Sequence, residues 1–427
     1  MMKGWTFLKI KDYPIQIIDG DRGTNYPTKE EFLQDGYCLF LNTGNVTLFG
    51  FNFDEKAFVT EEKHKKLRKG HLQRYDCVLT TRGTIGNVAF YGDSIPYDVV
   101  RINSGMLILR PDRSKLDPGF FYGLLRSSIF QQQAGLFRYG AAQPQLPITT
   151  LKHIRLPLPP LPIQQKIAGI LSAYDDLIDN NLKRIKMLEE MAQITYEEWF
   201  VRLRFNGHES TSINPETSLP EGWRMGTMQD LFDFKNGYAF KSGTYVQDGQ
   251  HKIVTIKNVQ DGSFIPDTTD TIAELPSNIK AHHHLSTGDI IISLTGNVGR
   301  VCLVYGENYL LNQRVAKVVP NNPADRLYVY ALLRSRGTLT QLANISNGAA
   351  QQNLSPVNAS KMAALIPARS VLDDFNKSIG SIVDLICLKN IENSQLREAR
   401  DILLPRLMTG VIDVEGYDPA QLLKEAA

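Results

Sequence analysis

The sequence predicts an α+β fold in which two mixed α/β domains in tandem repeat are separated by two long antiparallel helices that form a coiled coil. Three observations lead to this fold class. The chain has 427 residues, which is long for a single hydrophobic core. Its second half repeats the first in order, and each half ends in a long stretch with the apolar periodicity of a helix.

The internal repeat rests on matched phrases. GAAQ (140–143) recurs at 348–351 and LLRS (124–127) recurs at 332–335, both 208 positions further on. The same offset aligns Asp176 with Asp384, Ile178 with Ile386, Leu188 with Leu396 and Ile194 with Ile402. With shifted offsets, DCVLTTRGTIG (76–86) corresponds to DIIISLTGNVG (289–299), and Gly4-Trp5 corresponds to Gly222-Trp223. These matches indicate a two-fold repeat of roughly residues 1–205 and 206–427.

Each half has the same internal plan. Short strands and turns come first, as in DCVLTTRGTIGNVAFYG and DIIISLTGNVGRVCLVYG, because β-branched and apolar runs bounded by Gly and Asn are typical of strands. A short helix follows, around Pro118–Phe130 in the first half and Ala324–Leu342 in the second. In the first half a proline-rich joint, Leu156–Pro162, then leads into the long helix.

The long helix is the clearest element. Between Ile163 and about Trp199 apolar residues follow alternating four- and three-residue steps, which would give a helix of ~55 Å. The stripe consists of Ile167, Leu171, Tyr174, Ile178, Ile185 and Leu188, widened by Leu177 and Leu182, and its counterpart of Phe375, Ile379, Ile382, Ile386 and Leu396. A seam this long needs a partner, and we expect the two copies to pack as an antiparallel coiled coil.

Polar residues interrupt this seam. Asn181 lies in the first helix, with Lys389 at the matching place and Asn393 nearby in the second. A polar residue in a seam can set the register of two helices, but a helix bend or an exposed gap would place one there too. Pro405 stands where the first copy has Glu197, so we expect the second helix to end near Leu404.

Composition excludes several classes of protein. No apolar run approaches the ~18–20 residues of a membrane-spanning helix, and residues 1–13 do not resemble a signal peptide. The four cysteines are scattered, which suits a reducing cytoplasm and argues against a disulfide framework or a cysteine zinc site. The net charge of +2 is uninformative, but residues 63–74 (KHKKLRKGHLQR) form either a solvated basic loop or a phosphate-contacting strip.

Motifs of catalysis are missing from the sequence. It has no GxxxxGK[ST] phosphate loop, no GxSxG elbow, no GxGxxG dinucleotide motif and no adenine-methyltransferase motif. Three consecutive histidines, His282 to His284, would point to opposite faces of an extended segment and so are not expected to hold a metal. We therefore expect no catalytic, cofactor-binding or metal-ligating residues in this chain.

The loops instead offer charge and hydrogen bonding at equivalent places in both halves. Arg suits guanine edges and Asn or Gln suits adenine edges in the major groove of DNA, and glycine lets backbone approach a phosphate. The candidate DNA-binding residues are Arg22, Thr24, Arg82, Thr84, Gln143 and Gln145 in the first half, and Lys235, Asn236, Lys257, Asn258, Asn297, Arg300, Gln313, Arg314, Gln351 and Asn353 in the second.

The pattern resembles the specificity subunits of type I restriction-modification systems. The joint and helix start LPLPPLPIQQKIAGILSAYDDLIDNN (156–181) is similar to the family's central conserved region. LLPRLMTGVIDV (403–414) is typical of the family's C-terminal end, and LPEGW (219–223) and, more weakly, MKGW (2–5) resemble the start of its target-recognition domains. The GAAQ blocks and the D-x-x-x-[ST]-x-x-G-x-x-G turns also fit.

The resemblance implies a division of the chain and a set of partners. Residues 1–158 and 206–368 would be target-recognition domains, 159–205 the central conserved helix, and 369–427 the C-terminal conserved helix with a tail of no clear role at 417–427. The partners would be double-stranded DNA, two methyltransferase subunits and, in the full complex, two restriction/translocase subunits. S-adenosylmethionine, ATP and Mg²⁺ would belong to those cytoplasmic partners, and this chain would be a non-catalytic reader of a split, asymmetric site.

Two other functions stay open at this point. A specificity chain can serve a fused restriction-methylation enzyme that cuts beside its site. A structural protein can use a coiled coil and two globular ends to bridge other proteins without DNA, although the paired Arg-containing glycine turns argue against it.

One prediction concerns spacing. Two similar domains can meet major grooves on one face of a duplex about one turn, ~34 Å, apart, and the helices would set that separation. Deleting one heptad within Ile167–Leu188 should therefore change the unread spacer and leave both half-site sequences intact. Methylation-site mapping measures both, and an unchanged spacer would contradict the idea that the helices act as a ruler.

Overall fold

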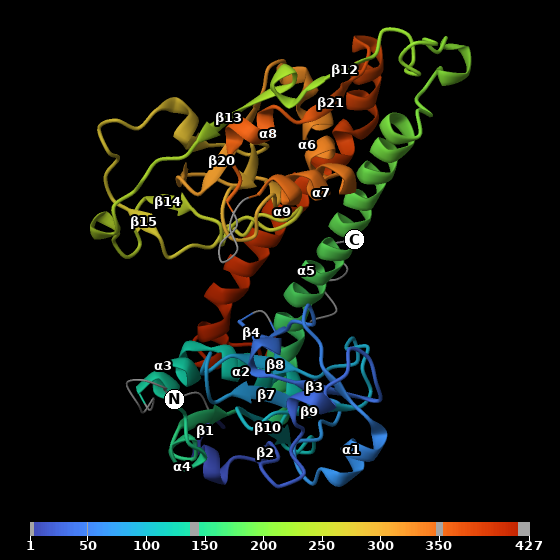
Figure 1. Ribbon diagram of the computed structural model, residues 1–427. Coiled ribbons are helices and arrows are strands. Elements are labelled where there is room, and N and C mark those ends of the chain that lie inside the picture. Colours follow the sequence, from blue (N-terminus) through green and yellow to red (C-terminus); the bar gives the residue numbers. More distant parts are fainter. Residues whose placement is uncertain (1–3, 49, 137–144, 347–352, 417–427) are drawn as a thin grey trace. The chain divides into compact units, whose positions relative to one another are not determined.

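The computed structural model describes residues 4–48, 50–136, 145–346 and 353–416. The chain divides into two compact units, residues 1–176 with 397–427 (unit 1) and residues 177–396 (unit 2). Each unit contains one repeat and parts of both long helices (Figure 1). The predicted fold class, two mixed α/β repeats with two long antiparallel helices, is confirmed. The finer four-segment division of the chain stays a prediction.

Unit 1 is built on a four-stranded antiparallel sheet of order β2-β10-β7-β8, a three-stranded sheet β6-β3-β9 and the pair β1-β11. Its strands are β1 Thr6–Lys9, β2 Ile15–Asp19, β3 Cys38–Leu41, β4 Val46–Thr47, β5 Gly50–Phe51, β6 Phe58–Val59, β7 Cys77–Thr80, β8 Val88–Phe90, β9 Val100–Ile102, β10 Met106–Pro111 and β11 Arg155–Leu158. Its shorter helices are α1 Glu61–Lys66, α2 Pro118–Arg126, α3 Ser128–Leu136 and α4 Ile148–Leu151.

Unit 2 repeats this topology. The sheet β13-β20-β17-β18 corresponds to the four-stranded sheet of unit 1, β15-β14-β19-β16 to the three-stranded one and β12-β21 to the pair. Its strands are β12 Arg224–Thr227, β13 Phe232–Asn236, β14 His251–Val254, β15 Thr271–Ile272, β16 His284–Leu285, β17 Ile290–Ser293, β18 Val301–Leu303, β19 Tyr309–Leu311, β20 Val315–Pro320 and β21 Ala363–Ile366. Its shorter helices are α6 Arg326–Arg334, α7 Arg336–Ile345 and α8 Pro356–Ser360. Even the parallel pairs recur, β3 with β9 and β14 with β19.

The single short helix expected in each half is two helices. The break falls at the serine of LLRS in both copies, Ser127 between α2 and α3 and Ser335 between α6 and α7. Both serines have extended backbone and are buried. The Ser127 hydroxyl donates to the Leu124 carbonyl at 2.7 Å, and the Ser335 hydroxyl accepts from the Thr338 amide at 3.3 Å. A serine side chain that bonds to nearby backbone competes with helix continuation, which explains the break.

The proline-rich joint is partly a strand. β11 pairs antiparallel with β1, and the Tyr13 hydroxyl donates to the Pro157 carbonyl at 2.6 Å. Proline is tolerated here because the two-stranded pair leaves its missing N–H on an open edge. The first long helix, α5, begins at Leu161 and ends at Tyr196, where a π-helical turn, Glu197–Val201, follows.

The second long helix, α9, runs from Arg369 to Met408, so the predicted end near Leu404 is wrong. Pro405 lies inside the helix and lacks only its own N–H, while its carbonyl accepts from the Thr409 amide at 3.0 Å. Leu407 and Met408 beyond it are almost fully buried, so packing outweighs the lost hydrogen bond. Gly410, at φ 70°, then ends the helix.

Both long helices contribute to the hydrophobic core of each unit. The core of unit 1 joins Ile167 and Leu171 of α5 to Leu407 and Met408 of α9. The core of unit 2 joins Phe375 and Ile379 of α9 to an aromatic group at the end of α5 formed by Tyr196, Trp199 and Phe200. The Phe200 and Phe375 ring centroids lie 4.8 Å apart.

Polar pairs connect the two helices within each unit. In unit 2 the buried Asn181 amide donates to the buried Asn393 side-chain oxygen at 3.0 Å. In unit 1 Arg400 donates to Asp175 at 2.5 Å. The partner of Asn181 is therefore Asn393 and not Lys389, which pairs with Glu392 on its own helix at 2.7 Å. Ascending positions on α5 meet descending positions on α9, as an antiparallel pair requires.

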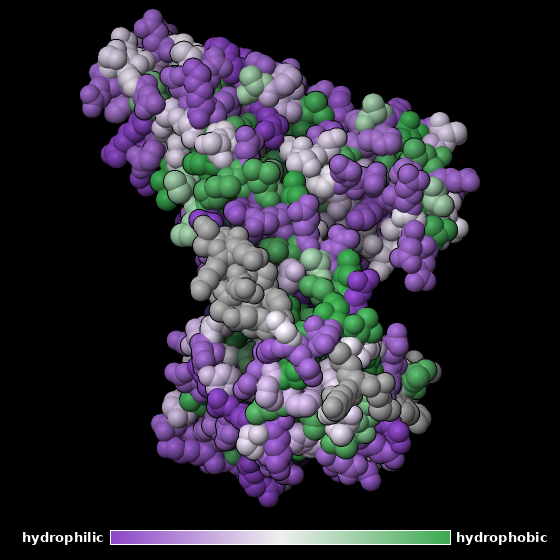
Figure 2. All heavy atoms as spheres, turned by 180° about the vertical axis from the view of Figure 1, so that it is seen from behind, coloured by the Kyte–Doolittle hydropathy of each residue, from purple (hydrophilic) through white to green (hydrophobic). Residues whose placement is uncertain are grey.

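Part of the expected apolar stripe faces outward. Leu177 and Leu182 are nearly half exposed. Other exposed apolar residues on the long helices are Met187, Met191, Ile194, Leu385, Leu388 and Ile402. Figure 2 shows hydrophobic side chains gathered where the long helices run. In the ranges that the structure describes, no helix is long and apolar enough to cross a membrane.

Candidate nucleic-acid interface

The signature D-x-x-x-[ST]-x-x-G-x-x-G forms the same turn in both units. In unit 1 the Thr80 hydroxyl donates to the Thr84 carbonyl and the Thr80 carbonyl accepts from the Gly86 amide at 3.0 Å. In unit 2 the Ser293 hydroxyl donates to the Asn297 carbonyl at 2.5 Å, and its carbonyl accepts from the Gly299 amide at 3.0 Å.

The glycines of this turn are required by its backbone. Gly83, Gly86, Gly296 and Gly299 all have φ between 69° and 92°, which other residues rarely adopt. The turn therefore presents the side chains of Arg82 and Thr84 in unit 1, and of Asn297 in unit 2, from a fixed backbone.

Two further segments meet this turn, again equivalently. The Thr81 amide donates to the Gly105 carbonyl at 2.8 Å, as the Leu294 amide does to the Arg314 carbonyl at 2.9 Å. A third segment forms one β-bridge, Arg82 with Gln145 in unit 1 and Thr295 with Asn353 in unit 2. Three segments thus converge at one place in each repeat.

The side chains at this place differ between the repeats. Unit 1 has Arg82 on the turn and Gly105 on the neighbouring segment, whereas unit 2 has Thr295 on the turn and Arg314 on that segment. Arg82 and Arg314 are both exposed. The backbone is conserved between the halves while the arginine moves from one segment to the other.

In unit 1 three candidates line one depression of about 220 Å³. Arg22, Arg82 and Gln145 surround it, together with Asp19. Arg22 donates to Asp19 at 3.2 Å and to the Ser104 carbonyl at 3.3 Å, which holds it beside the turn. Thr24 and Thr84 are exposed and lie close to Arg22 and Arg82 in the sequence, but they do not line this depression.

Several candidates of unit 2 lie around the equivalent place. Gln313 and Arg314 are exposed on the segment after β19, and Asn353 is exposed on the third segment. Arg300, at the end of the turn, donates to the Gln260 side chain, which fixes its guanidinium. Lys235 and Asn236 end the edge strand β13, where Lys235 pairs with Asp233 at 3.1 Å. Lys257 is exposed on another loop.

Asn258 is not available for base contacts, in contrast to the prediction from residue type. It is 2% exposed, its side-chain oxygen accepts from the Thr255 amide at 2.9 Å and its amide donates to the Ile265 carbonyl at 2.9 Å. Asn45 closes a loop in unit 1 in the same manner. The remaining candidates stay predictions, and Gln143 and Gln351 lie outside the described residues.

A partly buried ion cluster in unit 2 was not predicted from the sequence. Arg334, the arginine of LLRS, lies 3.6 Å from Glu189 of α5 and 3.6 Å from Asp261. Burial raises the pKa of Glu189, and the Arg334 charge opposes that shift. Gly262 has φ 73°, which other residues rarely adopt, and a Cβ there would lie 2.2 Å from the Arg334 guanidinium. The equivalent Arg126 of unit 1 lies 3.8 Å from Asp175 of α5.

The histidine run is part of the fold. His283 is buried, and its Nδ1 accepts from the Lys280 amide at 3.0 Å. Burial and the neighbouring charges of His282 and Lys280 lower the pKa of His283. Within the described ranges no group of three or more His, Cys, Asp or Glu side chains is arranged to hold a metal ion.

Comparison with known proteins identifies the family of this chain. The model of the type I restriction modification DNA specificity domain matches residues 2–190 and 220–368. The chain belongs to this family, as the resemblance of the motifs had indicated, and each repeat carries one match.

Two relatives are named specificity subunits, and one solved structure has the same fold. The chain is 22% identical to the type I restriction enzyme HindI specificity subunit of Haemophilus influenzae, over 92% of this chain and 98% of that protein. It is 24% identical to the MjaIX specificity subunit of Methanocaldococcus jannaschii, over 97% and 94%. The type I restriction-modification system S subunit from M. genitalium shares the fold with a TM-score of 0.53 at 18% identity, over 96% of this chain and 97% of that one.

The different positions of the arginine in the two repeats lead to a testable prediction. Arg82→Ala should relax the choice of one base pair in one half-site, and Arg314→Ala in the other half-site, because each arginine is exposed where three segments converge, Arg82 on the turn itself and Arg314 on the segment beside it. Loss of a good base contact should weaken discrimination by about 1–3 kcal/mol at that base pair. Binding to a library of single-base site variants measures the effect.

Arg155→Ala is the matched control, since Arg155 is an exposed cation on β11 that does not line the depression around Arg82. It should change no base preference. The prediction fails if both arginine variants bind every single-base variant with the wild-type ranking.

Proposed function

We propose that this chain reads a split, asymmetric DNA site for a type I restriction-modification complex, one half-site with each repeat. The observation that carries the proposal is the convergent turn, which has the same backbone in both units and different side chains. A shared backbone allows both repeats to approach DNA in the same manner. Different side chains give the two halves of the site different sequences.

The exposed chemistry supports DNA as the ligand. Arg82 with Gln145 in unit 1, and Arg314 with Asn353 in unit 2, combine a guanidinium with an amide at one place. Guanidinium groups suit guanine edges and amides suit adenine edges in the major groove. We infer that these residues contact bases and that phosphate contacts lie around them.

Partner subunits would carry out the chemistry. The relatives are named specificity subunits, and we propose that this chain is likewise non-catalytic and acts with two methyltransferase subunits and, in the full complex, two restriction/translocase subunits. S-adenosylmethionine, ATP and Mg²⁺ would bind those subunits. The exposed apolar residues of α5 and α9, such as Met187, Met191 and Leu388, are a suitable surface for them.

A cytoplasmic location would fit this role. The four cysteines are free thiols, and three of them are buried. Burial raises the pKa of Cys38 to about 12, so it stays an inert thiol at neutral pH. Free structural thiols are typical of a reducing compartment.

The test is to co-express the chain with a type I methyltransferase subunit from the same genome and to map modified adenines by long-read sequencing. A split, asymmetric motif with a fixed gap is expected. Restriction activity of the complex, with cutting beside the site, would favour the fused-enzyme alternative. If no complex forms and the purified chain ignores DNA at low salt, DNA reading is contradicted and a bridging role takes its place.

A further inference from the structure

Most cations of the basic strip at residues 63–74 are already neutralised. Lys63 pairs with Glu31 at 2.7 Å, and Lys65 and Lys66 pair with acids of their own helix, α1. Arg74 pairs with Asp98 at 2.6 Å and also donates to two carbonyls. The cations left over are Arg68 and Lys69, which are exposed and lie in no ion pair with the described residues.

Two buried charges hold the loop that carries Arg68 and Lys69. The carboxylate of Asp21, 6% exposed, accepts from the Arg68 amide at 2.7 Å and from the Lys69 amide at 3.4 Å. The guanidinium of Arg101, 5% exposed, donates to the Leu67 carbonyl at 2.9 Å and to the Lys69 carbonyl at 2.6 Å. Burying a charge is costly unless it is well hydrogen-bonded, and here both charges are used to fix one loop backbone.

The equivalent segment of the second repeat, around Ala281, lacks these two pairs of charges. His71 bridges Arg101 in unit 1, and the equivalent pair in unit 2 is His284 with Leu310. An apolar residue therefore replaces Arg101, and Ala281 with His282 stands in the place of Arg68 with Lys69. Because the same topology forms without them, the two buried charges and the two exposed cations are not demanded by the fold.

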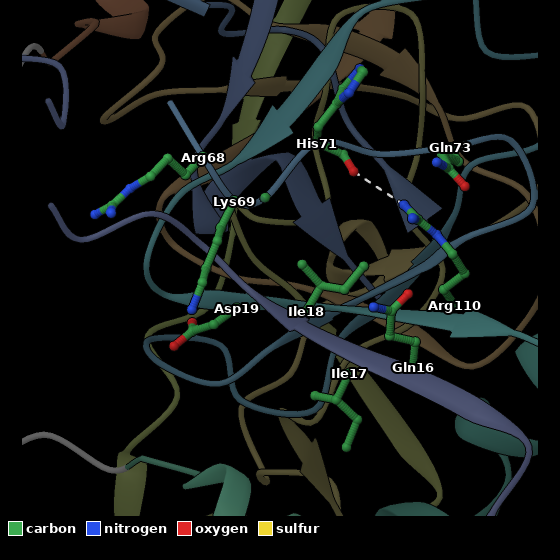
Figure 3. Close-up of a pocket in the computed structure, with 10 residues that line it drawn as sticks. Gln16, Ile17, Ile18, Asp19, Arg68, Lys69, His71, Gln73 and Arg110 are labelled. Carbon is green, nitrogen blue, oxygen red and sulfur yellow. Dashed lines mark hydrogen bonds between the residues drawn. The ribbon is translucent and has the colours of Figure 1, made fainter. Parts of the chain in front are cut away.

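A concave surface that encloses a volume of about 390 Å³ lies beside this loop (Figure 3). It is lined by Arg68, Lys69, His71 and Gln73, by Gln16 to Asp19 of the edge strand β2, and by Arg110 of the neighbouring strand β10. In Figure 3 Lys69 extends over the edge strand while Arg68 points away from it, so the two cations are spread along the surface.

The character of this surface suits a phosphodiester chain. Arg110 is paired with Asp76 at 2.8 Å, and burial with the charge of Arg101 lowers the pKa of His71, so Arg68 and Lys69 supply its positive charge. Gln16 and Gln73 add neutral donors. Asp19 lines both this surface and the depression that contains Arg82, and Arg22 neutralises it at 3.2 Å. The two hollows are therefore neighbours.

We propose that Arg68 and Lys69 form a phosphate-binding strip that holds the sugar-phosphate backbone of duplex DNA beside the half-site read by the first repeat. This inference rests on the proposed function. The strip would add affinity without sequence preference beside the first half-site, because Ala281 and His282 stand at the equivalent positions of the second repeat. The fixed loop would hold the duplex in register while the neighbouring turn meets the bases.

The first test compares two double variants in the complex with its methyltransferase subunits. Arg68→Ala/Lys69→Ala should flatten the slope of log K against log salt by about 2, since each phosphate contact contributes about 0.9. Affinity should fall equally for cognate and unrelated duplexes, and the methylated motif should stay the same. Lys65→Ala/Lys66→Ala removes the same charge from ion-paired lysines of the same strip and should leave the slope nearly unchanged. Arg68→Lys/Lys69→Arg should retain the wild-type slope.

The second test locates the phosphates. Neutral methylphosphonate groups placed singly along the site should weaken wild-type binding at positions flanking one half-site, and the same groups should have no further effect on Arg68→Ala/Lys69→Ala. An unchanged salt slope in that variant would overturn the inference, and so would a changed motif, because the residues would then read bases. If free inorganic phosphate at constant ionic strength weakens DNA binding by the wild-type protein as much as the methylphosphonate groups do, Arg68 and Lys69 form a small-anion site instead, and the inference is overturned. If wild-type protein shows no sequence preference, the proposed function itself has failed.

Discussion

The structure depends on a sharing of core residues between the two repeats. The fold of the first repeat does not close its own core, because Leu404, Leu407 and Met408 of the C-terminal helix fill it. Reciprocally, Tyr196, Trp199 and Phe200 at the end of the central helix fill the core of the second repeat. Burial of one such side chain contributes roughly 1.5–3 kcal/mol, so three of them are comparable with the roughly 5–15 kcal/mol by which a domain is stable.

Gly123 shows how closely the helices pack in the core of unit 1. A Cβ on Gly123 of α2 would lie 2.9 Å from the Met408 methyl group and 3.0 Å from Leu171. The helix α2 thus contacts α5 and α9 at once, and a side chain at this position would push one of them away. The same helix carries Arg126, whose partner Asp175 also binds Arg400 of α9.

The polar pairs of the seam explain why the helices meet in one register. An apolar seam alone tolerates slippage, whereas sliding α9 along α5 would separate Asn181 from Asn393 and break the buried hydrogen bond between them. The ion pair of Arg400 on α9 with Asp175 on α5 imposes the same condition.

The architecture was predictable from the sequence because duplication leaves its mark on spacing. A constant offset of 208 positions and a long apolar periodicity are independent of what the loops contain. The turn signature was also predictable, since its glycines are required by their positive φ.

The predictions that were wrong or missing concern features that depend on tertiary contacts. The breaks at Ser127 and Ser335 depend on side chains that bond to their own backbone, and the passage of α9 through Pro405 depends on burial of Leu407 and Met408. Asn258 has the residue type of a base reader but the burial of a loop anchor. The buried position of Arg101 could not be predicted, because the sequence alone does not distinguish a buried arginine in a strand from an exposed one. For most candidate residues the sequence indicates the type of contact and the location only.

The sharing of cores can be tested by hydrogen–deuterium exchange on the full chain and on a chain that ends at Leu396. The account predicts that the amides of β7 and β10 lose protection in the shortened chain, although every strand of the first repeat is still present. The amides of β17 and β20 should stay protected, because unit 2 keeps all its parts. Undiminished protection of β7 and β10 would show that the first repeat closes its own core and would contradict the account.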